Sequence, residues 1–294
     1  MAFSSLSAKI NNDLQSNDQI STWVAEYIFD YAASLKEREK KRHMFRKWSP
    51  QLEHRDSIVN FIKALADQLH YSHSTCHLAL YIIDQFMDDS HIIAETHLKL
   101  FALVCIILAA KHEENDTLVP KLSVLRKYAG VDFDRQDYID LEFRVMEHFD
   151  WELSMPTAVN FCEYHSLFAV FPADSVGLGY STKNLRSILC ALTYDYLEIS
   201  LNEICFRHYS PSKIAAVCLR AARVVLKLEP KWPKVLEMST GYSEEDLINC
   251  HRLLMRSIQL PDRKRKKNYG SPDTGYYTDS DASIVSPFAH KRQR

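Results

Sequence analysis

Glycine is scarce in this sequence, at six residues among 294. Glycine-rich loops that bind phosphate groups, and β architectures dense in turns, both need more of it, so both are disfavoured. The longest apolar stretch, Leu100 to Ala110, is far short of the ~20 residues that cross a bilayer. The N-terminus also lacks the basic start and continuous apolar core of a secretory signal. These absences favour a soluble, helical protein without membrane contact.

Metal-binding patterns are missing as well. The seven cysteines are dispersed among apolar residues and no two have C-x-x-C spacing, which predicts reduced core thiols in a cytosolic or nuclear protein. His73 and His77 have the spacing of metal ligands on a helix, and His70 could share their face. No Glu follows His73 directly, so the H-E-x-x-H pattern is absent. We expect no metal and no cofactor.

Motifs of catalysis are also absent. The sequence has no P-loop, no G-x-S-x-G turn and no kinase catalytic-loop pattern. Gly177-Leu178-Gly179 resembles part of a dinucleotide loop, but no strand precedes it and the third glycine is missing, so we interpret it as a linker. A helical metal-dependent phosphohydrolase would need adjacent His and Asp residues, and no His is followed directly by Asp. We therefore expect a non-catalytic protein.

Charge of both signs is present, but unevenly distributed. Residues 261–294 hold eight Lys/Arg and four Asp, which leaves 28 Lys/Arg and 34 Asp/Glu in residues 1–260. An acidic body is poorly suited to nucleic acid, because neutralising phosphate charge dominates such affinity. The tail has little apolar content and is expected to be disordered, with Ser271-Pro and Ser286-Pro resembling phosphorylation sites. Its basic run fits either nuclear import or a solubilising tail: Arg263, Lys264, Arg265, Lys266 and Lys267.

Apolar residues recur at helical spacing along most of the remaining chain. A first helix carries one apolar stripe from Ile20 to Tyr31 and continues into a charged end. Ser49-Pro50 and Ser210-Pro211 are typical helix starts, with a capping side chain followed by proline in the first turn. The other predicted helices span 51–70, 74–87, 94–111, 119–129, 135–149, 157–169, 183–201, 211–227, 231–238 and 243–258.

The second half loosely repeats the first. Residues 98–105 and 212–218 each open a helix rich in Ala, Ile, Leu and Val, as the central helix of a five-helix bundle must be. The predicted fold is all-α, with two tandem five-helix domains. The expected boundaries are a flexible N-terminus at 1–18, an N-terminal helix at 19–44, domains at 45–152 and 153–260, and a disordered tail at 261–294.

Several stretches of this pattern resemble known family motifs. The segment 54–62, His-Arg-Asp-Ser-Ile-Val-Asn-Phe-Ile, is similar to the opening of a cyclin box, usually Met-Arg-Ala-Ile-Leu-Val-Asp-Trp-Leu. Segments 78–87, 109–114 and 141–151 resemble later helices of that box, and 156–161 and 211–216 resemble parts of a second box. Their order and spacing across ~210 residues make the combined signal specific. The sequence is identified as a member of the cyclin family.

The resemblance implies roles for particular residues. Lys111 and Glu142 match cyclin residues that contact the regulatory helix region of a kinase. Taken alone, each is also typical of an ordinary charged position on a helix. Other residues match an internal ion pair between the first two box helices, Arg55 and Asp84, and an N-terminal helix that packs on the kinase, Trp23, Tyr27 and Tyr31.

The first box departs from the family at a patch that docks Arg-x-Leu motifs of substrates in many cell-cycle cyclins. A family Glu that receives the arginine appears as Ala64, and a nearby Gln appears as Lys99. Losing an acid and gaining a cation should repel an arginine. We expect docking there to be weak or absent. The altered patch comprises His54, Ser57, Ile58, Phe61, Ala64 and Lys99.

The resemblance implies a regulatory subunit that binds and activates a cyclin-dependent protein kinase in cell-cycle control. The expected partners are the kinase catalytic subunit, in a heterodimer, and protein substrates, without direct contact to nucleic acid. The expected location is nuclear, with possible shuttling to the cytoplasm. An alternative is a transcription-factor-like scaffold that uses cyclin-fold domains to hold DNA and protein, although the acidic body argues against it.

Overall fold

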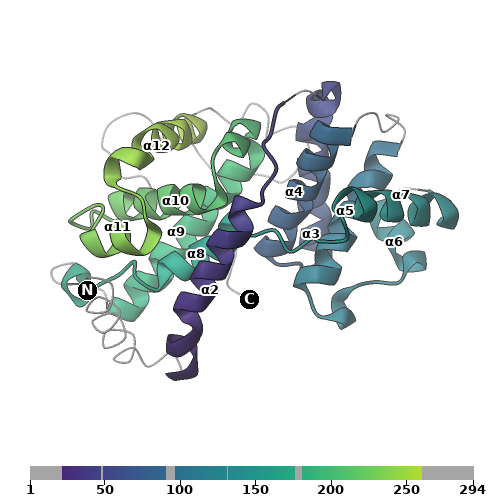
Figure 1. Ribbon diagram of the computed structural model, residues 1–294. Coiled ribbons are helices and arrows are strands. Elements are labelled where there is room, and N and C mark those ends of the chain that lie inside the picture. Colours follow the sequence, from purple (N-terminus) through teal and green to yellow (C-terminus); the bar gives the residue numbers. More distant parts are fainter. Residues whose placement is uncertain (1–21, 48, 91–96, 131, 176–180, 260–294) are drawn as a thin grey trace, which may run out of the picture.

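The computed structural model describes residues 22–47, 49–90, 97–130, 132–175 and 181–259 (Figure 1). Within these ranges every regular element is a helix, and the predicted all-α class is confirmed. The helices form two groups side by side, with α2 (Thr22–Lys40) lying across the front of the molecule in Figure 1. No described helix is both long and apolar enough to span a bilayer.

The first group surrounds α5, whose residues from Leu100 to Ala110 are all buried. A helix that is apolar on every side must be enclosed by other elements, and α3, α4 and α7 pack against this one. The elements of this group are η1 (Pro50–His54), α3 (Arg55–Leu69), α4 (His73–Ser90), α5 (Leu98–Glu113), η3 (Asp116–Leu118), α6 (Leu122–Ala129) and α7 (Arg135–His148).

The second group is arranged around α10, which α8, α9 and α12 contact most extensively. Ser210 caps this helix by accepting a hydrogen bond from the Lys213 amide, with Pro211 in the first turn. Each half therefore has a buried central helix, as the repeat predicted. The elements are α8 (Ala158–Ser166), η4 (Pro172–Ser175), α9 (Thr182–Asn202), η5 (Ile204–His208), α10 (Pro211–Val225), α11 (Lys234–Thr240) and α12 (Glu244–Gln259).

Some predicted helices are shorter than their apolar pattern. The segment predicted at 51–70 begins as the 3-10 turn η1, and α3 starts only at Arg55. The segment predicted from 119 becomes α6 only at Leu122, because Pro120 disfavours helical geometry at Val119, which is extended. The glycine linker at 177–179 and part of the helix start predicted at 94 lie outside the described residues.

The N-terminal helix α2 belongs to the core of the second group. Its buried residues Ile28, Ala32 and Leu35 join the apolar cluster formed by α8, α9, α10 and α12. At its C-terminal end the Glu39 carboxylate accepts hydrogen bonds from the amide and hydroxyl of Ser212, at 2.8 and 2.7 Å. The exposed face of α2 is thereby held in a fixed orientation beside the first group.

Candidate functional site

Lys111 and Glu142 lie together at the surface of the first group. Lys111 is in the last turn of α5 and Glu142 is in the middle of α7, and Lys111 Nζ donates to Glu142 Oε1 at 2.6 Å. The lysine is favoured there by the unpaired carbonyls at the helix end. About half of its side chain remains exposed, at 49%, against 23% for the carboxylate partner. The pair is therefore accessible to a binding partner.

Exposed apolar side chains continue from this pair along α7. Ile139 and Phe143 share one helix face, four residues apart, and are 40% and 52% exposed. Phe143 contacts Trp151 edge-on, with ring centroids 5.5 Å apart, and Trp151 is 60% exposed. Large exposed apolar groups next to a polar pair are typical of a protein interface. None of these three residues was assigned a role from the sequence, although Ile139 and Phe143 lie outside the apolar stripe of α7.

A groove of about 520 Å³ separates the end of α5 from α6 and α7. Its floor is apolar, with Ile107, Leu122, Leu125 and Ile139 among the lining residues. Its charged lining residues are all cations: Lys111, Lys121, Arg126 and Arg135. An apolar groove with a basic rim fits an amphipathic helix that carries acidic residues on its flanks. The groove was also missed by sequence reasoning.

The exposed side of α2 continues this surface. Tyr27 and Tyr31 are 58% and 41% exposed, and burial of the remaining part of Tyr31 raises the pKa of its hydroxyl, with the nearby Glu163 acting in the same direction. Glu113, the last residue of α5, also raises the pKa of Tyr31 through its charge, so the ends of the two helices lie near each other. Trp23 lies in the first turn of α2, but its side chain is outside the described residues.

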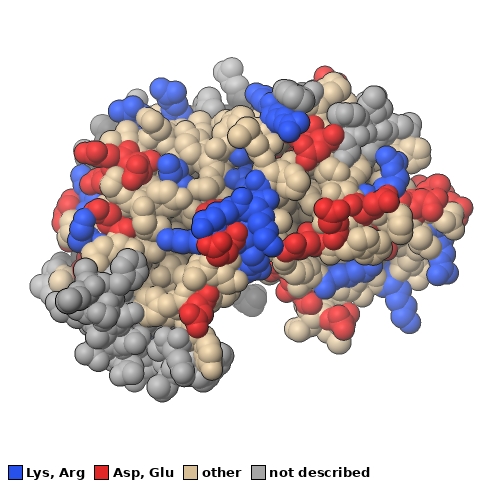
Figure 2. All heavy atoms as spheres, in the orientation of Figure 1, with Lys and Arg blue, Asp and Glu red and all other residues tan. Residues whose placement is uncertain are grey.

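Charge on the face seen in Figure 2 is unevenly distributed. Figure 2 shows Lys and Arg gathered in the middle of the view, over α2, and a band of Asp and Glu across the neighbouring first group, with further Lys and Arg below that band. The pKa values of Glu113 and Glu163 are both raised by burial, and each of these half-buried carboxylates lies near a second acid. A cationic partner group placed there would relieve that repulsion.

Arg55 and Asp84 form a buried ion pair between α3 and α4. Arg55 Nε donates to Asp84 Oδ1 at 2.8 Å and Nη2 donates to Oδ2 at 3.1 Å, with both side chains almost fully enclosed. Arg55 also donates to the carbonyls of Leu201 and Asn202 at the end of α9. Arg207 approaches Asp84 from the second group, at 3.4 Å. The pair thus connects both halves, a role that the family resemblance did not imply.

The altered patch lies along α3 and the start of α5. Ile58 is buried, Ser57 and Lys99 are exposed, and the other members are half-buried. His54 lies 3.5 Å from Glu53, its neighbour in η1. The acidic position and the cationic substitution, Ala64 and Lys99, are on two helices that pack together. Substrate docking at this patch is not tested by the geometry and stays a prediction.

The histidines considered as metal ligands have structural contacts in this fold. His73 Nδ1 lies 3.0 Å from Glu198 Oε1 and its ring stacks on Tyr194, which joins α4 to α9. His70 ends α3 in a left-handed conformation, with φ of 58°. Among the described residues no three His, Cys, Asp or Glu side chains are grouped to hold a metal ion. The basic run 263–267 and both Ser-Pro pairs lie outside the described residues.

Two family models match consecutive parts of the chain. The model of the cyclin N-terminal domain matches residues 27–154, and that of the cyclin C-terminal domain matches residues 156–281. The chain belongs to the cyclin family. The predicted family is therefore confirmed, and the two helical groups are its tandem cyclin domains.

Similar proteins agree with this assignment. Cyclin-J of Xenopus laevis is 31% identical over 92% of this chain and 73% of its own length. Cyclin-J of Homo sapiens is 32% identical over 79% of this chain, which spans only 62% of that relative. The likeness to cyclin J, which the variant first box suggests, is thereby confirmed. A G2/mitotic-specific cyclin-1 of Medicago sativa subsp. varia is 25% identical over 81% of the chain.

Solved structures share the cyclin fold at low sequence identity. A viral cyclin from herpesvirus saimiri aligns with a TM-score of 0.64 and 16% identity, covering 78% of this chain and 96% of that one. A chain of the CAK complex from Chaetomium thermophilum bound to ATP-gamma-S aligns with a TM-score of 0.53 and 15% identity, covering 89% and 77%. Cyclins are regulatory, non-catalytic subunits of protein kinases, and family membership gives this cyclin a regulatory role in the same broad sense.

Proposed function

We propose that this cyclin binds and activates a cyclin-dependent protein kinase through the face formed by α2, the end of α5, α6 and α7. The observation that supports it is the Lys111–Glu142 pair, placed at 2.6 Å between a basic-rimmed apolar groove and exposed aromatic side chains. A polar pair inside an apolar surface fixes the orientation of a partner, while the apolar area supplies affinity. The groove has the form needed for one helix of the kinase.

Activation follows from what phosphoryl transfer requires. A kinase is active only when its own Lys–Glu ion pair and its metal-binding Asp are assembled, which its regulatory helix and activation loop control. A partner that binds only the assembled state increases the population of that state. Changing a 1:99 ratio to 99:1 needs about 5.5 kcal/mol of differential binding free energy. The cyclin supplies binding surface and no reacting group.

The experiment is co-purification of the full chain with cyclin-dependent kinase catalytic subunits, using wild type and the double variant Lys111→Ala/Glu142→Ala. We expect the double variant to lose the kinase while its far-ultraviolet circular dichroism stays unchanged, because both side chains are at the surface. A matched control is Lys234→Ala/Glu237→Ala, which removes another exposed pair, at 2.7 Å, on α11 and outside the proposed face. A retained, active complex of the first variant would refute the assignment.

The altered patch supports a second part of the proposal: Arg-x-Leu docking is weak in this cyclin. Ala64 offers no acceptor for the arginine of the motif, and the exposed Lys99 adds a like charge nearby. We expect an Arg-x-Leu peptide to bind weakly to wild type and more tightly to Ala64→Glu/Lys99→Gln, measured by fluorescence polarisation. Submicromolar binding to wild type would overturn this part.

The basic run at 263–267 supports a nuclear location, with shuttling, for the proposed complex. The relatives named G2/mitotic-specific cyclins are consistent with a role in cell division. A fluorescent fusion of the full chain should accumulate in the nucleus. Replacing the five basic residues by Gln or Ser should shift it to the cytoplasm, and an unchanged distribution would leave the run as a solubilising tail.

A further inference from the structure

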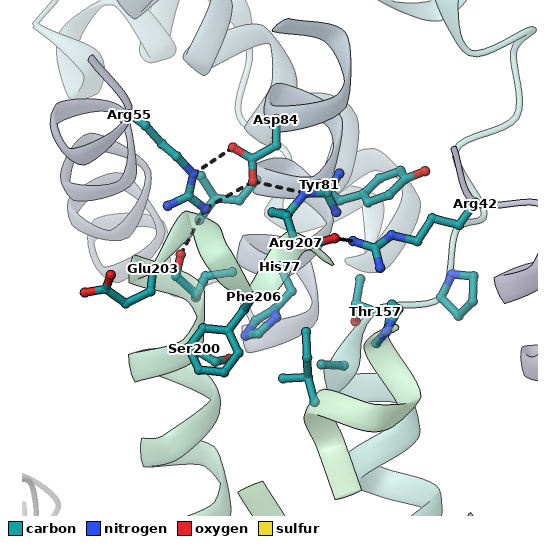
Figure 3. A pocket seen from close by; sticks show the side chains of 16 residues that line it. Arg42, Arg55, His77, Tyr81, Asp84, Thr157, Ser200, Glu203, Phe206 and Arg207 are labelled. Carbon is teal, nitrogen blue, oxygen red and sulfur yellow. Dashed lines mark hydrogen bonds and ion pairs between the residues drawn. The ribbon is translucent and has the colours of Figure 1, made fainter. Parts of the chain in front are cut away.

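A small cavity lies where the two cyclin domains meet, beside the Arg55–Asp84 pair (Figure 3). Its volume is about 60 Å³. A buried water occupies roughly 10–15 Å³ on such a measure, so the cavity has room for about four water-sized groups. Side chains from both domains and from the connection after α2 line it, including His77, Asp84, Arg207 and Arg42.

Three nitrogen atoms of these lining residues have no hydrogen-bond partner in the protein. They are Arg42 Nε, Arg207 Nε and His77 Nε2. Arg207 Nε lies 3.4 Å from Asp84 Oδ2 but makes no hydrogen bond to it. His77 is only 7% exposed, and burial lowers its pKa to about 4, so its ring is neutral at pH 7. All three atoms can donate a hydrogen bond.

Several groups around the cavity already make hydrogen bonds. Both oxygens of Asp84 accept from Arg55. Arg42 donates through its two terminal nitrogens to the carbonyls of Tyr209, at 2.6 Å, and Arg207, at 3.0 Å. In Figure 3 the carboxylate of Glu203 points away from the labelled arginines. The Tyr81 hydroxyl, another lining group without a hydrogen-bond partner, can accept as well as donate, whereas the two arginine nitrogens can only donate.

Such a cavity suits an anion better than water. A water molecule that accepts hydrogen bonds from these nitrogens also needs acceptors for its own two hydrogens, whereas an anion only accepts. The Nε edge of arginine, with its fixed fork of donors, is well suited to oxyanions. Burial, together with the charge of Arg207, lowers the pKa of Arg42 to about 10. An anion between the two guanidinium groups would remove that repulsion.

We propose that this interdomain cavity binds a free tetrahedral oxyanion, of the size and charge of inorganic phosphate, held by Arg42, Arg207 and His77. About four water-sized positions match the four oxygens of the ion. The bound ion bridges a residue of the connection, a residue of the first domain and a residue of the second. It is therefore an inorganic ligand that stabilises the relative placement of the two domains.

The test is isothermal titration of the full chain with sodium phosphate, in a buffer without other oxyanions, and with sodium chloride at matched ionic strength. Phosphate should bind saturably at one site and raise the melting temperature, and chloride should do neither. Arg42→Gln should weaken phosphate binding about tenfold, the loss expected for one charge-assisted hydrogen bond. The control Arg252→Gln, at an exposed arginine on α12, should bind as wild type does.

Three results would overturn the proposal. One is an equal change in the melting temperature of the wild-type protein with phosphate and with chloride. This result does not depend on whether a variant folds. Another is phosphate affinity that is unchanged in a folded Arg42→Gln protein. The third is a phosphoserine peptide that binds at least as tightly as the free ion, which would assign the site to a phosphorylated partner.

Discussion

At the scale of single residues, the buried polar groups make more contacts than their sequence motifs suggest. Arg55 was expected to pair with Asp84, and the two do meet, but the carboxylate also faces Arg207 of the second domain. No local pattern could predict Arg207, because it is 123 positions from Asp84 and lies in a short 3-10 turn. The resemblance located one contact, and the packing of the two domains determines the rest.

Removing the shared carboxylate should therefore be costly. Asp84→Asn leaves the buried Arg55 and Arg207 without their countercharge, and we expect a loss of about 3–5 kcal/mol in the free energy of unfolding. Urea denaturation followed by circular dichroism measures it. Glu37→Gln, which breaks an exposed pair with Lys40, is the control and should cost less than about 1 kcal/mol. Equal losses would contradict the account.

A buried histidine should make stability depend on pH. His165 is fully enclosed, neither ring nitrogen has a partner, and burial lowers its pKa to about 3. Between that value and the ordinary histidine pKa of about 6.5, the unfolded chain binds a proton that the folded chain does not. The free energy of unfolding therefore decreases as the pH falls below 6.5.

The variant His165→Leu should lack this contribution. Between pH 7 and pH 5 its loss of stability should be smaller than that of wild type by about 2 kcal/mol. Urea denaturation at the two pH values measures the difference. The exposed His208→Gln serves as the control and should keep the wild-type dependence. If His165→Leu and wild type lose the same amount, another group is responsible.

At the scale of elements, the helices were predictable because their apolar stripes are long and regular. The errors occur at ends, where Pro120 and the cap at Ser49 determine the geometry and hydrophobic periodicity does not. The exposed face of α7 shows a second limit of hydrophobic periodicity. Ile139 and Phe143 lie outside the apolar stripe of α7, so periodicity can place them at a surface, but it does not show which other groups they adjoin there.

Helix α2 packs against the second domain on one side and is exposed on the other. Leu35→Ala should destabilise the protein by about 2–5 kcal/mol, because Leu35 is 1% exposed within the core of the second domain. Tyr27→Ala, on the exposed side of α2 with the tyrosine 58% exposed, should change stability by no more than about 0.5 kcal/mol. Thermal unfolding of the two variants compares them directly. A large loss for Tyr27→Ala would place that face in the core.

At the scale of the whole molecule, the family, the all-α class and the tandem arrangement could be predicted from the sequence, since ordered motifs carry them. The groove between α5, α6 and α7 and the interdomain cavity could not be predicted. Each depends on side chains from three or more elements, and the distances between those elements are set by packing. In the face proposed for the kinase, Lys111 and Glu142 could be predicted from motifs. Their apolar surroundings could be identified only in the folded structure.

The most direct test of the central claim is the rate of phosphoryl transfer by a purified cyclin-dependent kinase, titrated with this cyclin. The account predicts a rate that increases with cyclin and saturates at one cyclin per kinase, with no increase for Lys111→Ala/Glu142→Ala at the same concentrations. A kinase that binds the wild-type chain stoichiometrically without any change in rate would contradict it. So would full activation by the double variant.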